Sequence, residues 1–132
     1  MVSALSLKPE DEVIGTIQGQ KARSKEEWRV SQALDKYGWV YIYQYQVFGG
    51  VTVRGGQVID FLVFTAPRST PVQVYGEYWH RGQMSSEDRM KQIQLETRMK
   101  GQMNKVLIIW GQDVQTQVEA NQVIRRELGV NK

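Results

Sequence analysis

Hydrophobic residues recur at helical spacing early in the chain, directly after a polar segment that can cap a helix. In Ser24-Lys25-Glu26-Glu27, the Ser24 hydroxyl can accept from a backbone N–H of the first turn, and Glu27 stands three residues later. The apolar positions that follow lie on one helical face: Val30, Ala33, Leu34 and Tyr37. Gly38 stands where a glycine ends a helix. The pattern predicts a first helix over about residues 25–37.

After that helix the pattern changes to runs rich in aromatic and β-branched residues, which are typical of strands. These runs predict strands at 39–47, 58–64, 72–75 and 105–110. The last run is continuously apolar, as in a fully buried strand. Pro67 and Pro71 indicate a turn, and glycines bracket a hairpin-like connection that carries Arg54. Ser85 or Ser86 can cap a second helix, and a last helix is predicted near 114–128.

This succession of elements predicts an α/β protein. The order α-β-β-β-α-β-α favours a mixed β-sheet flanked by helices, in a single domain that spans residues 24–132. Residues 1–23 are poorly periodic, and we interpret them as an N-terminal arm or a short capping element. Within them, Gly15, Gly19 and residues 21–23 are expected to be loop. The total length of 132 residues suits one domain.

The composition excludes several kinds of chemistry. The absence of cysteine rules out disulfides, thiolate zinc sites and cysteine nucleophiles, and a single histidine rules out a metal site with two histidines in one chain. The net charge of +3 and the pI of about 9.2 suit a polyanionic partner without requiring one. No apolar run approaches the roughly 20 residues of a membrane span. The first residues lack the basic start of a signal peptide, so we expect a soluble, cytoplasmic protein with no membrane partner.

Three residues stand out as candidates for chemistry. Asp60 interrupts an apolar strand, where an ionised carboxylate is costly to bury unless it is paired or binds a metal; strand alternation could equally turn it toward solvent. His80 is the only imidazole, which suits it to proton transfer near neutral pH, although a structural role is also open. Glu27 fits the capping box, yet it shares a helical face with Val30 and could reach a site at the sheet edge.

Together these elements resemble the core of the PD-(D/E)XK nucleases: a first-helix Glu27, a strand with Ile59-Asp60-Phe61, and a further strand some dozen residues later. A closer resemblance is to the very-short-patch-repair (Vsr-like) endonuclease branch. It is carried by Tyr75-Gly76-Glu77-Tyr78-Trp79-His80, by Asp88-Arg89 at the opening of a helix, and by the strand 105–110 that ends in Trp110. The resemblance covers about residues 24–126 and implies a restriction-endonuclease-like fold.

The resemblance implies a role for each matching position. Asp60 matches the metal-binding aspartate, and Val74 stands where that branch lends a backbone carbonyl to the metal. His80 matches the histidine that activates the attacking water, and Glu27 matches a glutamate that tunes the site or binds a water of the metal shell. The general pattern has a glutamate and a lysine where this chain has Gln73 and Tyr75. Further candidates for the site are Gln73, Tyr75, Glu77 and Asp88.

The expected function is that of a metal-dependent endonuclease that hydrolyses DNA phosphodiester bonds, in repair, recombination or a mobile element. The implied cofactor is Mg²⁺, which holds its waters and needs only one or two carboxylates, and Mn²⁺ could substitute for it. The alternative is a catalytically weak nucleic-acid-binding module on the same fold, and a homodimer remains open. Five basic residues are expected to contact phosphates: Lys21, Arg23, Lys25, Arg54 and Arg81.

Overall fold

The computed structural model describes residues 13–76 and 84–132. Its helices are α1 (Lys25–Lys36), α2 (Ser86–Arg98) and α3 (Gln117–Glu127). Its strands are β1 (Thr16–Ile17), β2 (Gln20–Lys21), β3 (Tyr41–Val47), β4 (Gln57–Val63), β5 (Thr70–Tyr75) and β6 (Leu107–Trp110). Two short 3₁₀ turns, η3 (Gly50–Thr52) and η4 (Gly111–Asp113), follow β3 and β6.

The main sheet has four strands in the order β3-β4-β5-β6. The neighbours β3, β4 and β5 pair antiparallel, whereas β6 pairs parallel to β5 after the crossover through α2. The sheet is therefore mixed, and β1 and β2 form a separate two-stranded hairpin. The predicted α/β class and the order α-β-β-β-α-β-α are confirmed from residue 25 onward.

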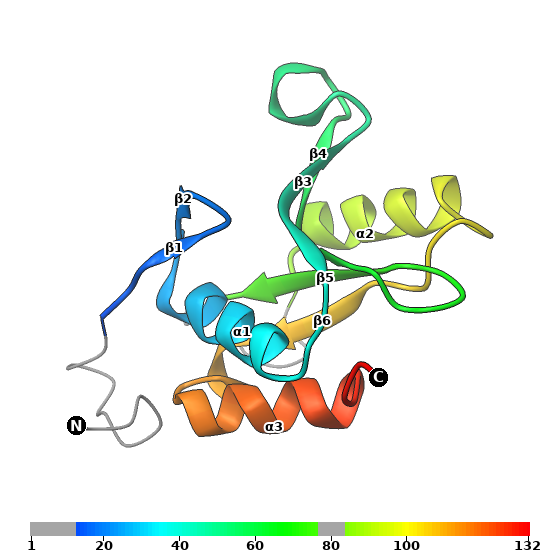
Figure 1. Cartoon of the computed structure of the whole chain (residues 1–132). Helices are drawn as coiled ribbons and strands as arrows, with labels where there is room; N and C mark the ends of the chain where they lie inside the picture. Colours follow the sequence, from blue (N-terminus) through cyan, green and yellow to red (C-terminus); the bar gives the residue numbers. More distant parts are fainter. Residues whose placement is uncertain (1–12, 77–83) are drawn as a thin grey trace, which may run out of the picture.

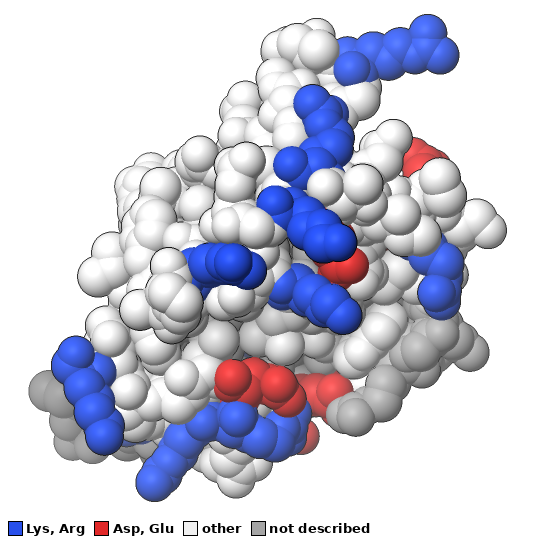
Figure 2. Space-filling view, turned by 90° about the vertical axis from the view of Figure 1, so that its right-hand side faces the viewer, with Lys and Arg blue, Asp and Glu red and all other residues white. Residues whose placement is uncertain are grey.

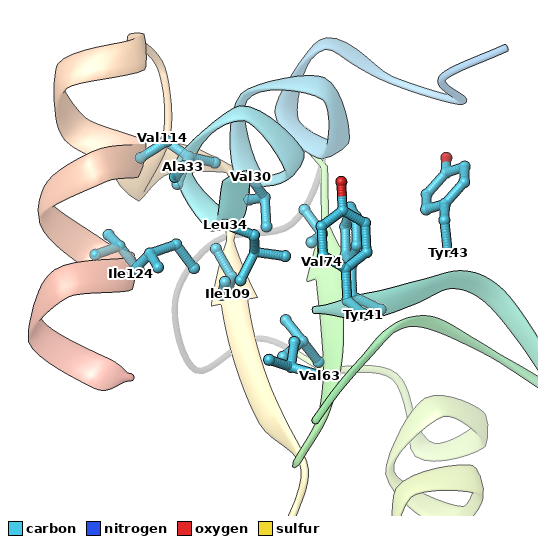
Figure 3. Close-up of a cluster of buried hydrophobic side chains, with 14 of the residues drawn as sticks. Val30, Ala33, Leu34, Tyr41, Tyr43, Val63, Val74, Ile109, Val114 and Ile124 are labelled. Carbon is cyan, nitrogen blue, oxygen red and sulfur yellow. The ribbon is translucent and has the colours of Figure 1, made fainter. Parts of the chain in front are cut away.

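The core lies between the sheet and the pair of helices α1 and α3, which pack side by side (Figure 1). Figure 3 shows Val30 and Leu34 of α1 pointing toward Val74 and Ile109 of the sheet, with Ile124 of α3 beside them. Burial of one such side chain stabilises the fold by roughly 1.5–3 kcal/mol. The apolar face predicted for the first helix is therefore the face that builds the core.

Helix α2 lies apart from α1 and α3, beside the long β3–β4 hairpin (Figure 1). It is anchored by Leu95, which is buried in a second, smaller cluster with Val47 and Ile59. Each of the three helices begins at a hydroxyl cap: Ser24, Ser85 and Thr116 accept from the backbone N–H three residues later. The cap predicted at Ser24 is confirmed, and of the two serines considered for the second helix Ser85 is the cap.

The expectation of loop is confirmed at Gly15, Gly19 and residues 22–23, and only Lys21 lies in a strand, β2. The β1–β2 hairpin itself was not predicted, and its Ile17 is buried in the main core. The expectation for the last strand was wrong. The last strand is not fully buried, because within residues 13–76 and 84–132 β6 is an edge strand that pairs only with β5. Only Ile109 of β6 is buried, and the other three side chains are half-buried.

Pro71 does not lie in a turn but in β5, where it faces Leu62 of β4. The Val74 N–H points toward β4, so by alternation the backbone nitrogen of Pro71 lies on the β6 side of the strand. Pairing with β6 begins only at Val72, one residue later. The missing N–H of proline therefore removes no bond from the ladder.

Candidate functional site

The candidate site lies where β4 and β5 separate. Their last antiparallel pair is Phe61 with Val72, so the next residues in register would be Asp60 and Gln73. The side chain of Gln73 enters the gap between the strands instead. Its Oε1 accepts from the Asp60 backbone N–H at 2.9 Å, and its Nε2 donates to the Val58 carbonyl at 3.2 Å. The amide thus bonds to the backbone of β4 where the two strands no longer pair.

The half-buried Asp60 carboxylate occupies this gap. Its Oδ2 accepts from the Val74 backbone N–H at 2.8 Å, and its Oδ1 accepts from Gln44 Nε2 at 3.4 Å. In an extended strand the N–H and C=O of one residue lie on the same edge. The Val74 carbonyl therefore faces the same gap as the carboxylate.

Glu27 approaches this carboxylate from the first turn of α1. Its side chain is 8 % exposed, and its Oε2 accepts from the Ser24 hydroxyl at 3.0 Å. The same hydroxyl accepts from the Glu27 backbone N–H at 3.1 Å, so the cap is present. Its other oxygen, Oε1, accepts from the Tyr43 hydroxyl at 2.8 Å and from Gln44 Nε2 at 3.3 Å. The two interpretations of Glu27 are compatible, because one carboxylate oxygen binds the hydroxyl of the capping Ser24 while the other faces the site.

Gln44 joins the two carboxylates, and the sequence analysis did not single it out. Its Nε2 is shared between Glu27 and Asp60, and its backbone φ is +56° in the middle of β3. A non-glycine residue in this region costs about 1–3 kcal/mol and is often found at functional sites. The only signal in the sequence is a polar residue that interrupts the aromatic run of β3, which alternation alone explains equally well.

The electrostatics of the site are dominated by burial of negative charge. Burial, followed by the charge of Glu27, raises the pKa of Asp60 to about 7. The Val74 N–H, the Gln44 amide and the charge of Arg23 act in the opposite direction. Burial also raises the pKa of Tyr43 to about 12, so its hydroxyl stays protonated as a donor to Glu27. A cation between these carboxylates would relieve the cost of their burial.

The other candidates of the sequence analysis are placed less centrally. Tyr75 packs its ring on Trp110 with centroids 5.5 Å apart, and burial raises its pKa to about 12. Asp88 lies in the first turn of α2, where its Oδ2 accepts from the Ser85 hydroxyl at 2.9 Å. Glu77, His80 and Arg81 lie outside the described residues.

Exposed basic side chains lie on and beside two hairpins. The residues Lys21, Arg23 and Lys25 are exposed within and directly after the β1–β2 hairpin, and Arg54 is exposed in the β3–β4 connection. Figure 1 shows both hairpins extending upward from the body of the fold. The positive charge of Arg23 lowers the pKa of Asp60, which places Arg23 near the site.

Comparisons with protein-family models, with curated proteins and with solved structures find no match. Within residues 13–76 and 84–132, no three His, Cys, Asp or Glu side chains gather as a metal-binding group. No helix in that part of the chain has the length and apolar character needed to cross a membrane. The functional argument therefore depends on the pair Glu27 and Asp60 and on their surroundings.

Proposed function

We propose that this chain is a metal-dependent DNA endonuclease with a PD-(D/E)XK-type core resembling the Vsr-like branch. One observation carries the proposal: the Asp60 carboxylate lies in the gap between β4 and β5, facing Glu27, with a pKa raised to about 7. Retaining a carboxylate at such a position is costly unless a ligand compensates for it. The exposed basic residues Lys21, Arg23, Lys25 and Arg54 support a nucleic-acid substrate.

The donor set fits Mg²⁺. This ion takes oxygen ligands, keeps several waters and is commonly held by one or two carboxylates. Asp60 and the Val74 carbonyl would hold it directly, and Glu27 would hold one of its waters. When bound, a divalent ion supplies neutralisation of charge on the phosphate and acidification of a bound water.

The chain's own residues prepare and assist the hydrolysis. The Val74 N–H fixes Oδ2 of Asp60, while Tyr43 and Gln44 orient Glu27. Asp60 must release its proton to act as a ligand, so the affinity for the metal would fall as the pH drops below about 7. His80, which the resemblance proposes as the base, would accept the proton of the attacking water.

The alternative, a catalytically weak nucleic-acid-binding module, is favoured by one observation. Gln73 stands where the general pattern has a carboxylate, and both ends of its amide are engaged with β4. It therefore offers the site no acidic ligand. The two functions differ in whether DNA is cut or only bound.

Cleavage of a panel of labelled DNA duplexes, nicked and mismatched duplexes and branched junctions, with Mg²⁺ or Mn²⁺, tests the proposal. We expect metal-dependent cleavage that Asp60→Asn abolishes while DNA affinity is retained. Asp35→Asn is the matched control. It makes the same chemical change at an exposed carboxylate of α1, which accepts from the Tyr41 hydroxyl. Cleavage by the Asp60 variant at the parental rate contradicts the assignment, and binding without cleavage by the parent favours the alternative.

A further inference from the structure

A groove lies at the end of the molecule where α2 ends and the segment leading into β6 begins. It has a volume of about 540 Å³, and it is bounded by the second half of α2, by residues 99–106 and by Arg68 and Pro71. This volume is in the range of sites that bind ligands or peptide side chains. It shares no lining residue with the site around Asp60.

The groove is held open by hydrogen bonds of the fold itself. Asn104 donates from its side chain to the Arg68 carbonyl at 3.1 Å and to the Thr70 hydroxyl at 2.9 Å. Its backbone N–H donates to the Ser69 carbonyl at 2.8 Å. These bonds tie the segment after α2 to the β4–β5 connection, so a ligand would meet a groove that is already formed.

The floor and one wall of the groove are apolar. Leu95 is 1 % exposed and closes the floor, and Met99 and Met103 lie half-buried beside it. Ile93 forms the wall and leaves 48 % of its surface exposed. Methionine side chains are flexible and polarizable, so such a floor can adapt to apolar side chains of different shapes.

The rim is cationic. Arg68, Lys100 and Lys105 line the groove and are exposed, and within the described part of the chain no ion pair to any of them is found. The acidic residue at the groove, Glu96, already accepts from the Val106 N–H and from Gln92. Figure 2, which views this side of the molecule, shows Lys and Arg side chains gathered down the middle of the face with few acidic ones between them.

We propose that this groove binds an acidic peptide segment of a partner protein. Its apolar side chains would lie on the methionine floor, and its carboxylates would meet the three rim cations. A nucleic acid fits less well, because among the described residues no aromatic side chain lines the groove for base stacking and the apolar floor offers phosphates no donor. The inference is independent of the proposed nuclease activity.

Fluorescence anisotropy of the metal-free protein tests this proposal. The probe is a fluorescein-labelled peptide in which pairs of acidic residues alternate with leucines. We expect saturable binding that weakens about tenfold in the rim variant Lys100→Glu/Lys105→Glu. The matched control, Lys36→Glu/Arg125→Glu, changes the net charge equally at exposed sites on α1 and α3 and is expected to stay within about twofold of the parent.

A second pair of variants tests the apolar wall. Ile93→Ser is expected to weaken binding severalfold, whereas Met90→Ser, on the same helix but outside the groove, leaves it unchanged. Asp60→Asn binds the peptide like the parent, so failure of the nuclease assignment would leave this result intact. The proposal is overturned if no saturable binding occurs or if a peptide with serine in place of leucine binds equally well. Equal weakening by both charge variants, or rim-dependent preference for a single-stranded oligonucleotide, overturns it too.

Discussion

Replacing Asp60 by asparagine is expected to stabilise the metal-free protein at pH 8 and to change its stability little near pH 4. The ordinary pKa of the carboxyl is 3.8, and burial together with Glu27 raises it to about 7 in the folded protein. Between these two values the unfolded chain releases a proton that the folded protein keeps. Stability is therefore present at low pH and is lost progressively as the pH rises from about 4 to about 7.

The size of this loss follows from the gap between the two pKa values. At about 1.4 kcal/mol per pKa unit, the gap corresponds to roughly 4 kcal/mol. Because the carboxylate is only half-buried, solvent screens part of the penalty, and we expect about 2–4 kcal/mol. Asparagine has no proton to lose, and its side-chain oxygen can still accept from the Val74 N–H.

Urea denaturation followed by tryptophan fluorescence, in EDTA and at several pH values from 4 to 8, measures the effect. Asp35→Asn serves as the control, because it makes the same chemical change on an exposed side chain of α1. Other groups titrate in all three proteins, so the divergence of the Asp60 variant from the parent isolates this one carboxyl. Parallel stability curves for the parent and the Asp60 variant would refute the raised pKa of Asp60. They would also refute the argument that burying this carboxylate in its charged form is costly.

Further predictions concern the same site. Mg²⁺ is expected to raise the melting temperature of the parent at pH 8 but not that of the asparagine variant, and calorimetry near pH 7 in buffers of different ionisation enthalpy should show proton release on binding. Glu27→Gln should slow cleavage by more than it lowers stability, whereas Ser24→Ala should lower mainly stability; if Glu27→Gln shifts only the melting temperature, its role is capping alone. Arg54→Gln should lower the salt dependence of DNA affinity by about one counterion while Lys36→Gln leaves it unchanged, and equal slopes would make Arg54 only a solubilising charge. His80→Ala should reduce the cleavage rate roughly 10²–10⁴-fold with Mg²⁺ binding intact, and parental cleavage by His80→Asn would exclude it as the base.

The elements that depend on local interactions were predictable. Ser24 and Ser85 cap their helices through bonds that span three residues, so the sequence located the first helix start at Ser24 and the second to within one residue, at Ser85 or Ser86. The apolar spacing of α1 likewise identified the face that packs against the sheet. Where a long-range partner decides the outcome, prediction failed: nothing near β6 shows that it lies at a sheet edge, and nothing near Pro71 shows when pairing with β6 begins.

The same division holds for the candidate site. The sequence by itself determined that Asp60 is a carboxylate within an apolar strand and that Glu27 begins a helix, because both are statements about neighbours along the chain. Only the tertiary structure brought the two together from β4 and α1, placed Gln44 of β3 between them, and set Gln73 in the gap that β5 leaves beside β4. The raised pKa of Asp60 likewise depends on the tertiary structure. Desolvation and the charge of a residue 33 positions away depend on how strands and helices pack, and no local pattern of residues contains that information.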